Sequence, residues 1–410
     1  MLRSGSICIS FLYNYLTNEC NTSQTGNNET MIKKADKLKC LSDTFQSYGG
    51  VLAKLSQILC FEDGKGDVFS DCKPYCQKET IEYIKNEYVT NSDFFKHVKY
   101  LDFNVYKSGS IGEVHRAIYK EDIDIVIKVQ YVGLHEQFQS DIFILDKITS
   151  YLFYFADLST AMLDIKTKLY EELDYKIEFK NQQKMYELWE TNENIKIAKL
   201  IPELCTDKLL TMNYIDAESL FTFFETSTQD ERNIIGKYLV EFIFVNFYKY
   251  GIFYSDIHYG NFLVKNKNIL YVTDFGCINT LEPIFLDNMV RLHKTLIEKD
   301  KDEFYNVVKD LGILNDNLSL ESKEYMYEYF TLQYEPWTSP EFEFTEEWLK
   351  KSVYKKPKYM KDWVLPSNCV YLNKIPYGSY HIFTKLGLKG NFLELFITLF
   401  TPVFNKMGHL

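Results

Sequence analysis

Three side chains in the second half of the sequence have the types and spacing that magnesium–phosphate chemistry requires. Asp256 and Asn261 stand five residues apart, and Asp274 follows Asn261 by thirteen residues. Carboxylate and amide oxygens are ligands that Mg²⁺ prefers, and a carboxylate beside the reacting group can orient or deprotonate a nucleophile. The pattern therefore predicts Asn261 and Asp274 as metal ligands and Asp256 as a catalytic residue.

A glycine-containing loop upstream could hold phosphates. The segment Lys107-Ser-Gly-Ser-Ile-Gly-Glu-Val114 lies between two runs whose apolar residues alternate as they do in strands. Its glycines let backbone amides approach phosphates closely, although two glycines three residues apart also fit an ordinary hairpin. The nucleotide contacts predicted from this loop are Ser108, Gly109, Ser110, Gly112 and Val114.

A lysine at the end of an apolar strand could complete the phosphate ligands. Lys128 follows the apolar run 125–127, sixteen residues after Gly112. A lysine that binds phosphates needs a carboxylate to hold it, and Glu172 and Glu178 in a charged helical segment offer one. We predict Lys128 and Glu172 as a catalytic pair. The alternative is a lysine that extends its ammonium group from a strand edge into solvent.

The composition limits the classes of protein that can carry these residues. The chain has 410 residues, 46 basic and 57 acidic side chains, a net charge of −11 and 46% hydrophobic residues. This length exceeds the size at which one hydrophobic core keeps growing, so two lobes are expected. The profile is that of a globular protein and excludes a disulfide miniprotein and a polytopic membrane protein. The acidic balance argues against nucleic acid as a partner.

Cysteine and targeting signals favour an intracellular protein that is not secreted. Six of the nine cysteines precede position 77, and Cys72 and Cys76 could form half of a zinc site, but reduced thiols are the preferred interpretation because no second pair is evident. The apolar stretch 7–16 is too polar for a secretory signal, and no run reaches the ~20 apolar residues of a transmembrane helix. The run 392–404 predicts a buried C-terminal helix, with peripheral membrane contact as the alternative.

The periodicity of apolar residues divides the chain into segments. They are a variable tail over 1–30, a helical extension over 31–100, a small β-rich lobe over 101–215 and a larger helical lobe over 216–410. The last strand of the small lobe ends at Asn213 and Tyr214, which we expect to contact the nucleotide. A strand pair at 262–264 and 269–273 separates Asn261 from Asp274. The aromatic residues predicted to form the core of the larger lobe are Phe242, Phe244, Phe247 and Phe253.

The order of these motifs matches that of protein kinases. A glycine loop, a strand lysine, D-x-x-x-x-N and D-F-G follow one another in the kinase pattern, whose catalytic loop reads H-R-D-x-x-x-x-N. The predicted fold is therefore α+β, a protein-kinase-like bilobal fold with a helical N-terminal extension. His258, two residues after Asp256, resembles the H-x-D-x-H-x-x-N loop of small-molecule phosphotransferases, although a structural role is the preferred interpretation of this histidine.

The sequence resembles more specifically the UbiB/AarF family of atypical kinase-like proteins, whose members support coenzyme Q biosynthesis. The family motifs are K-x-G-Q, A-A-A-S-I-G-Q-V-H, V-A-V-K-V-Q, E-x-D-Y-x-x-E and D-P-H-P-G-N. The matching segments are Lys54-Leu-Ser-Gln57, Lys107-Ser-Gly-Ser-Ile-Gly-Glu-Val-His115, Ile125-Val-Ile-Lys-Val-Gln130, Glu172-Leu-Asp-Tyr-Lys-Ile-Glu178 and Asp256-Ile-His-Tyr-Gly-Asn261. The resemblance covers about residues 48–280, and the tail around Gly378–Gly390 is similar to the last helices of the family.

The resemblance assigns a role to the helical extension. It implies that Lys54 and Gln57 reach into the nucleotide cleft, where a typical kinase leaves room for a peptide substrate. It also implies that Lys54 faces the carboxylates of Glu178 and Asp274. Lys54, Gln57 and Glu178 therefore join the predicted nucleotide-binding set, whereas Asp274 remains a predicted metal ligand.

Three positions depart from the family motifs. Ser56 replaces a glycine and could loosen close helix packing. Gly109 replaces the last alanine of the phosphate loop and makes the loop more kinase-like. Glu113 replaces a glutamine expected beside the phosphates, where an extra negative charge could weaken nucleotide binding or require more metal. The last two changes act in opposite directions, so nucleotide affinity is not predictable from them.

The function implied by the resemblance is an atypical kinase-like ATPase or phosphotransferase that binds ATP and Mg²⁺. Its expected partners are a hydrophobic quinone precursor or lipid-biosynthesis enzymes, and family precedent adds mitochondria to the cytoplasm as an expected location. The alternative is a nucleotide-binding pseudokinase scaffold without turnover. The basic run that starts at Lys350 and Lys351 is interpreted as a solvated loop, with anionic lipid contact as the alternative.

Overall fold

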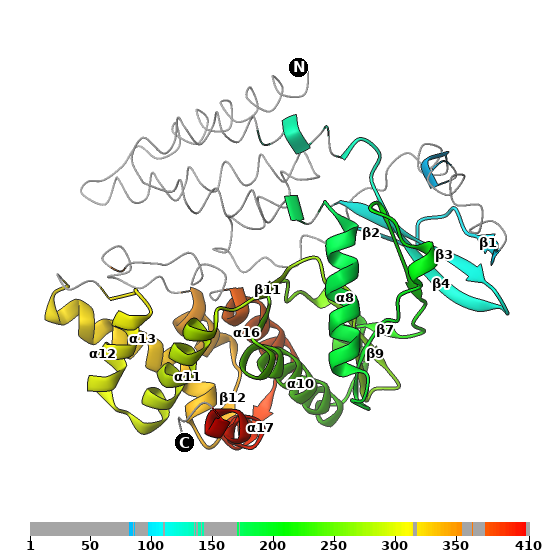
Figure 1. Ribbon diagram of the computed structural model, residues 1–410. Helices are drawn as coiled ribbons and strands as arrows, with labels where there is room; N and C mark the ends of the chain where they lie inside the picture. Colours follow the sequence, from blue (N-terminus) through cyan, green and yellow to red (C-terminus); the bar gives the residue numbers. More distant parts are fainter. Residues whose placement is uncertain are drawn as a thin grey trace, which may run out of the picture. The chain divides into compact units, whose positions relative to one another are not determined.

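The described part of the chain forms two compact units in a computed structural model (Figure 1). One unit comprises residues 1–177 and 200–214, and the other comprises 178–199 and 215–410. The residues that the structure describes are 82–84, 86, 97–109, 111–134, 136, 138–140, 142, 170, 171, 173–314, 318–354, 363 and 374–406. The predicted tail over 1–30, most of the predicted extension over 31–100 and the Cys72–Cys76 pair lie outside these ranges.

The described residues of the first unit form one antiparallel sheet, in which β3 and β4 are the longest strands (Figure 1). Its strands are β1 (Val98–Leu101), β2 (Lys107–Ser108), β3 (Gly112–Tyr119), β4 (Ile123–Gln130) and β6 (Leu209–Asn213). Their order is β1-β3-β4-β6, and β2 pairs with β3. The predicted strands are confirmed, whereas Val98–Leu101 is an edge strand that pairs with β3 where helical character was predicted up to about residue 100.

Alternation along β3 and β4 gives the sheet two different faces. Ile125, Ile127 and Val129 point into the core of the first unit, and Val126 and Lys128 point to the opposite face. The turn between the strands has positive φ at Glu121 and Asp122, as a two-residue hairpin turn requires. The strand pattern therefore fixes which residues share a face with Lys128.

In the part of the second unit that the structure describes, the strands form three small sheets. In the largest, with the order β5-β10-β9-β7, β5 runs parallel to β10 and the other pairs are antiparallel. The strands of this unit are β5 (Ile195–Ile197), β7 (Glu218–Ser219), β8 (Ile252–Tyr254), β9 (Phe262–Lys265), β10 (Ile269–Val272), β11 (Ile278–Thr280), β12 (Phe342–Glu343) and β13 (Lys389–Gly390). The predicted strand pair is confirmed as the β9–β10 hairpin. The pairing of β5 with β10 explains why residues 178–199 belong to this unit, although they fall within the predicted 101–215 segment.

Helices form most of the second unit (Figure 1). They are α8 (Tyr175–Trp189), α9 (Leu220–Thr226), α10 (Gln229–Phe244), α11 (Pro283–Glu298), α12 (Lys301–Asp310), α13 (Leu320–Thr338), α14 (Glu346–Leu349), α16 (Lys374–Leu386) and α17 (Phe392–Lys406), with short 3₁₀-helices at Pro202–Leu204 and Tyr259–Asn261 and π-helices at Val245–Lys249 and Lys350–Tyr354. The first turn of α8 belongs to the first unit. Side-chain caps start several of these helices, and Thr228 and Glu231 form a capping box on α10.

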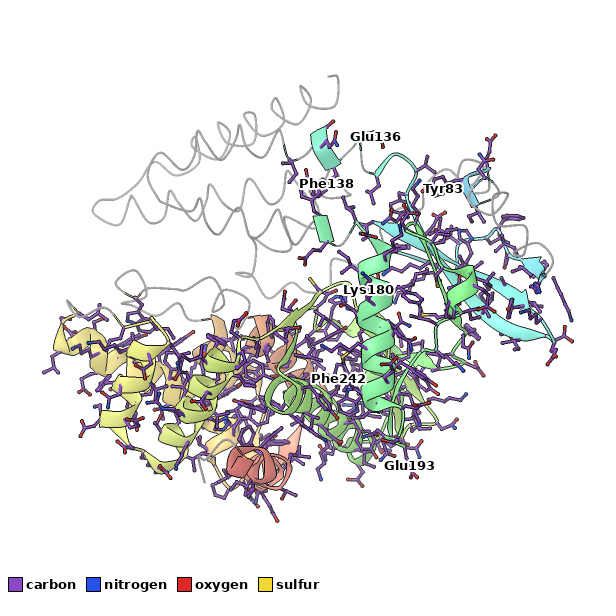
Figure 2. All side chains as sticks on the ribbon, viewed as in Figure 1. Tyr83, Glu136, Phe138, Lys180, Glu193 and Phe242 are labelled. Carbon is purple, nitrogen blue, oxygen red and sulfur yellow. The ribbon has the colours of Figure 1, made fainter. Side chains whose placement is uncertain are left out.

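The core of the second unit is rich in aromatic side chains. Phe242 on α10 lies among them (Figure 2), and the predicted core residues Phe244, Phe247 and Phe253 are also buried. The C-terminal helix α17 buries Phe392, Phe396 and Phe400 but exposes Ile397, so it is amphipathic rather than buried all round. Within the described ranges, no helix is both long and apolar enough to cross a membrane.

Candidate functional site

The predicted phosphate loop lies at the start of the β3–β4 hairpin in the first unit. The amide of Gly109 donates to the carbonyl of Gly112 (2.8 Å), and the Tyr131 hydroxyl donates to the carbonyl of Gly109 (3.0 Å). Ser108 pairs with Glu113 across β2 and β3, and Ser110 lies outside the described residues. One backbone hydrogen bond and the Tyr131 hydroxyl therefore hold Gly109 in place beside Gly112.

Gly112 is required by a close approach of two strands. A Cβ atom at this position would lie 2.4 Å from the carbonyl oxygen of Val129 and 2.8 Å from the hydroxyl of Tyr175. Neighbouring backbone cannot move away as a flexible side chain can, so only glycine fits here. The sequence pattern selected Gly112 for contact with phosphates, and the structure adds a packing reason for the same residue.

Lys128 lies directly opposite Val114 in the β3–β4 ladder, so both predicted residues share the face turned away from the core. The Lys128 ammonium nitrogen is 5.2 Å from the centre of the Tyr175 ring, a cation–π distance. Tyr175 is fully buried and was missed as a site residue. The E-x-D-Y motif contains Tyr175 and could have identified it as a candidate site residue. Glu172, the predicted carboxylate partner of Lys128, lies outside the described residues.

Glu113 does not share this face. It alternates with Val114 and is fully buried, and its carboxylate Oε1 lies 3.2 Å from Nε2 of His115. The two-residue period of β3 turns the Glu113 side chain into the core of the first unit, away from the face that carries Val114 and Lys128.

Asn213 and Tyr214 end β6 next to the start of β4. Asn213 is opposite Ile125, and the Tyr214 amide donates to the carbonyl of Asp124 (2.9 Å). The Arg116 guanidinium covers the Tyr214 ring, with its carbon 3.9 Å from the ring centre. One face of this predicted nucleotide contact is thus already occupied by a protein side chain.

In the second unit, Asp256 and Asn261 are joined by the loop between β8 and β9. The Asn261 side-chain amide donates to the backbone carbonyl of Asp256 (2.9 Å) and to its carboxylate (3.0 Å). Thr273 donates its backbone amide to the Asn261 carbonyl, which ties the loop to the end of β10. Because the side-chain nitrogen of Asn261 donates to Asp256, the side-chain oxygen is the atom that could bind a cation.

His258 has a structural role in the same loop. Its Nδ1 accepts a hydrogen bond from the amide of Gly260 (3.1 Å) and caps the 3₁₀-helix Tyr259–Asn261. Helix α16 packs closely against the loop at Gly378, where a Cβ atom would lie 2.5 Å from the carbonyl oxygen of Ile257. This arrangement agrees with the interpretation of His258 as a loop residue.

Asp274 follows β10 and lies beside a second carboxylate. One Asp274 oxygen accepts the amide of Gly276 (3.1 Å), and a Cβ atom on Gly276 would lie 3.5 Å from Asp274 Oδ1 and 3.8 Å from Glu178 Oε2. Glu178, in the part of α8 that belongs to the second unit, is only 3% exposed. One turn further along α8, the Asn181 side chain donates to the carbonyl of Phe275 (3.0 Å). Asn181 was not selected from the sequence, because the residues around it contain no motif that predicts a contact with Phe275.

Tyr254 lies beside all three predicted chemical groups of this unit. Its hydroxyl donates to the backbone carbonyl of Asp274 (2.9 Å). The pKa of Tyr254 is raised well above its ordinary value, chiefly by burial and then by the negative charges of Asp256 and Asp274, while a hydrogen bond with Asn261 acts in the opposite direction. The hydroxyl therefore keeps its proton at physiological pH.

The donor set fits a magnesium ion that takes most of its ligands from phosphate and water. Among the described residues, no group of three or more His, Cys, Asp or Glu side chains could hold a metal by itself. Asn261 and Asp274 would provide two hard oxygen ligands next to the β9–β10 hairpin, and Mg²⁺ usually takes no more than one or two of its ligands from the protein. An all-protein site, such as a structural zinc centre, does not fit these residues.

The two predicted residues of the extension, Lys54 and Gln57, lie outside the described residues, as do Ser56 and the basic residues that follow Tyr354. Lys350 and Lys351 themselves are described, and each lies within 4.0 Å of a glutamate one turn earlier in the chain. This pairing agrees with the solvated interpretation of the run.

The fold and the order of the motifs define an α+β protein of the kinase-like class. A model of the ABC1 atypical kinase-like domain matches residues 67–308, more than half of the chain, and the chain belongs to this family. The resemblance to the UbiB/AarF family is thereby confirmed, since relatives named AarF domain-containing kinase and COQ8 share this domain.

Similar proteins come from several organisms. The probable serine/threonine-protein kinase abkB of Dictyostelium discoideum is 28% identical over 347 residues, which cover 76% of this chain and 50% of that protein. The mitochondrial atypical kinase COQ8 of Schizosaccharomyces pombe is 23% identical over 367 residues, or 85% of this chain and 60% of that protein. The chain spans about half the length of the curated relatives it matches.

A solved structure shares the fold. A Mycobacterium tuberculosis protein, determined as a complex with erythromycin, superimposes with a TM-score of 0.66 over 91% of this chain and 97% of that chain. The two sequences are 19% identical, so the likeness supports the kinase-like fold alone.

Proposed function

We propose that this chain binds ATP with Mg²⁺ and acts as an atypical kinase or ATPase of the UbiB type. The observation that carries the proposal is the pair of hydrogen bonds from Asn261 to Asp256, together with the bond from the Thr273 amide to the Asn261 carbonyl, which ties Asn261 to the residue before Asp274. A carboxylate and an amide oxygen near each other are ligands that Mg²⁺ prefers. Membership of the atypical kinase-like family supports the same reaction class.

Each residue has a role in this proposal. The loop 107–112 and Lys128 bind phosphates, and Glu172 holds Lys128. Asn261 and Asp274 hold the magnesium ion, which when bound neutralises charge on the phosphates. Asp256 lies one hydrogen bond from Asn261 and orients or deprotonates the attacking hydroxyl or water. The protein's contribution is positioning and charge stabilisation rather than covalent catalysis.

The acceptor is proposed from the family. UbiB-type members support coenzyme Q biosynthesis, so we propose ATP hydrolysis coupled to the handling of a hydrophobic quinone precursor, or to lipid-biosynthesis enzymes. Lys54 and Gln57 are proposed to occupy the place of a peptide substrate, which disfavours ordinary protein phosphorylation. Relatives named as mitochondrial and chloroplastic support an organelle as one proposed location.

A pseudokinase scaffold is the second candidate. The proposed phosphate and metal ligands are all present in the sequence, which disfavours a scaffold that never turns over ATP. Tyr214 favours it, because Arg116 already covers one face of this predicted nucleotide contact. Stabilisation by nucleotide without hydrolysis would support the scaffold.

The test is magnesium-dependent ATP turnover by the purified chain. Lys128→Ala and Asp274→Asn should each reduce turnover by about a hundredfold or more, since each removes a charge that stabilises the transferring phosphate. Lys99→Ala and Asp230→Asn are matched controls on exposed residues and should leave turnover unchanged. Turnover that survives both site substitutions would contradict the proposed function.

A further inference from the structure

Tyr254 occupies the position where the kinase catalytic loop has histidine, two residues before the catalytic Asp. It is the last residue of β8 and lies opposite Ile278 on β11. Strand β8 leads into the Asp256 loop, and β11 follows the Asp-Phe-Gly segment. Tyr254 therefore lies between two functional segments. The chain runs from Tyr254 into the Asp256 loop, and its strand partner Ile278 follows the Asp-Phe-Gly segment.

Its ring and its hydroxyl do different things. The ring packs among Phe242, Phe262 and Phe275, with centroids 5.4, 6.3 and 6.1 Å away. The hydroxyl points to the backbone carbonyl of Asp274 at 2.9 Å. Aromatic packing alone would be satisfied by phenylalanine, so the hydroxyl is the feature that needs a reason.

The hydrogen bond acts on the residue that we propose as a metal ligand. Asp274 is held from two sides: Gly276 donates to its carboxylate, and Tyr254 donates to its carbonyl. Ser255 adds a further tie between the two segments, because its amide and its hydroxyl both donate to the Cys277 carbonyl at 3.1 Å. Together these bonds fix where the Asp274 carboxylate lies relative to Asp256 and Asn261.

We propose that Tyr254 is a positioning residue for the metal: its hydroxyl holds the Asp274 backbone and thereby aligns the Asp274 carboxylate with the Asn261 amide. This inference rests on the proposed function.

The experiment compares Tyr254→Phe with a matched control. The Phe variant keeps the ring and removes only the hydroxyl. Tyr248→Phe removes another buried tyrosine hydroxyl, which lies 3.2 Å from His293 Nδ1 rather than at Asp274. ATP binding is measured by thermal shift or by fluorescence of a trinitrophenyl-ATP probe, first in EDTA and then at increasing Mg²⁺.

Tyr254→Phe should raise the Mg²⁺ midpoint about five- to tenfold and leave binding in EDTA unchanged, since groups that orient metal ligands commonly change metal affinity by this order. Tyr248→Phe should leave the midpoint at the wild-type value. Tyr254→His, the kinase residue, should recover part of the loss. If Tyr254→Phe does not fold, Tyr254→His is compared with the wild type instead, and its Mg²⁺ midpoint should still lie above the wild-type value.

Each contrary result has a separate meaning. An unchanged midpoint in Tyr254→Phe, or an equal shift in Tyr248→Phe, would overturn the positioning role and leave the proposed function standing. An absence of Mg²⁺-dependent ATP binding in the wild-type chain would instead contradict the proposed function itself, and this inference with it.

Discussion

Lys128 and Asp274 are held in place by different kinds of interaction. In the first unit, strand register places Lys128 opposite Val114, and the backbone contact at Gly112 fixes the hairpin. In the second unit, hydrogen bonds between side chains and backbone hold Asp274 and Asn261. A ladder of backbone bonds tolerates most side-chain changes but not a steric clash, whereas a hydrogen-bonded loop loses its geometry one bond at a time. Substitutions should therefore have abrupt effects in the first unit and graded effects in the second.

Gly112→Ala should have the largest effect. The added methyl group would meet the Val129 carbonyl at 2.4 Å, so the β3–β4 hairpin must shift, and we expect a loss of about 3 kcal/mol of stability together with weaker ATP binding. Gly109→Ala is the matched control for stability, because its nearest neighbour would be the Gly112 carbonyl at 3.4 Å. Thermal unfolding checks both. If both variants unfolded at the same temperature, a steric clash at Gly112 would not be what distinguishes the first unit from the second.

Acid should affect the second unit through His293. Complete burial lowers the pKa of His293 from 6.5 to about 3, and the ring stacks on Phe396 at 3.8 Å. The folded state therefore favours the neutral form: the stabilisation is fully present above pH 6.5 and declines as pH falls from 6.5 towards 3. We expect a loss of about 2 kcal/mol between pH 6.5 and 5, since each pH unit contributes up to about 1.4 kcal/mol.

Tryptophan fluorescence can follow this loss, because all four tryptophans (Trp189, Trp337, Trp348 and Trp363) belong to the second unit. Denaturant unfolding at several pH values should show the decline in the wild type. His293→Gln should be less stable at pH 7 but lose this part of the pH dependence. If the free energy of unfolding of His293→Gln fell with pH as steeply as that of the wild type, other groups would be responsible for the acid sensitivity.

Asn181→Leu should have a smaller effect. The substitution removes the hydrogen bond to the Phe275 carbonyl and leaves that carbonyl without this donor, which costs about 1 kcal/mol. The free energy of unfolding and the Mg²⁺ midpoint for ATP should both change slightly. Lys180→Ala, at the adjacent exposed position of α8 (Figure 2), is the control and should match the wild type. A large effect would contradict the graded behaviour expected of the second unit.

Arg116→Met should have the smallest effect. The methionine keeps much of the apolar stem over the Tyr214 ring and removes the cation–π contact, so we expect a loss of less than about 1 kcal/mol in thermal unfolding. The ATP affinity of Arg116→Met also tests whether Arg116 affects nucleotide binding at Tyr214. Tighter binding in this variant would mean that Arg116 competes with the nucleotide for Tyr214, and weaker binding would mean that the pair acts together.

Short-range pattern predicted much of the fold. The alternation of β3 and β4 and the β9–β10 hairpin followed from period-two sequence and turn residues. The place of β5 did not follow, because it pairs in parallel with β10, more than seventy residues later, and such pairing leaves no local signal. The edge strand β1 was also missed, since a partly exposed edge strand carries little alternation.

The predicted site residues were those whose motifs are contiguous in sequence. Asp256, Asn261 and Asp274 could be selected from their spacing, but Asn181 and Tyr254 act through contacts that only the folded chain brings together. Glu113 is the instructive case. The same alternation that placed Val114 with Lys128 also places Glu113 on the other face, so the sequence held the information and the motif-based interpretation overlooked it.

The π-helix Val245–Lys249 has a dynamic consequence. Val245, Asn246, Phe247 and Tyr248 are all buried, so four consecutive residues lack an exposed side. A segment of this kind cannot open locally to solvent, and its amide hydrogens should exchange only when the whole unit unfolds. Strand β8 and the Asp256 loop follow it directly. The loop with the proposed catalytic residue is thus anchored to what should be among the slowest-exchanging segments of its unit.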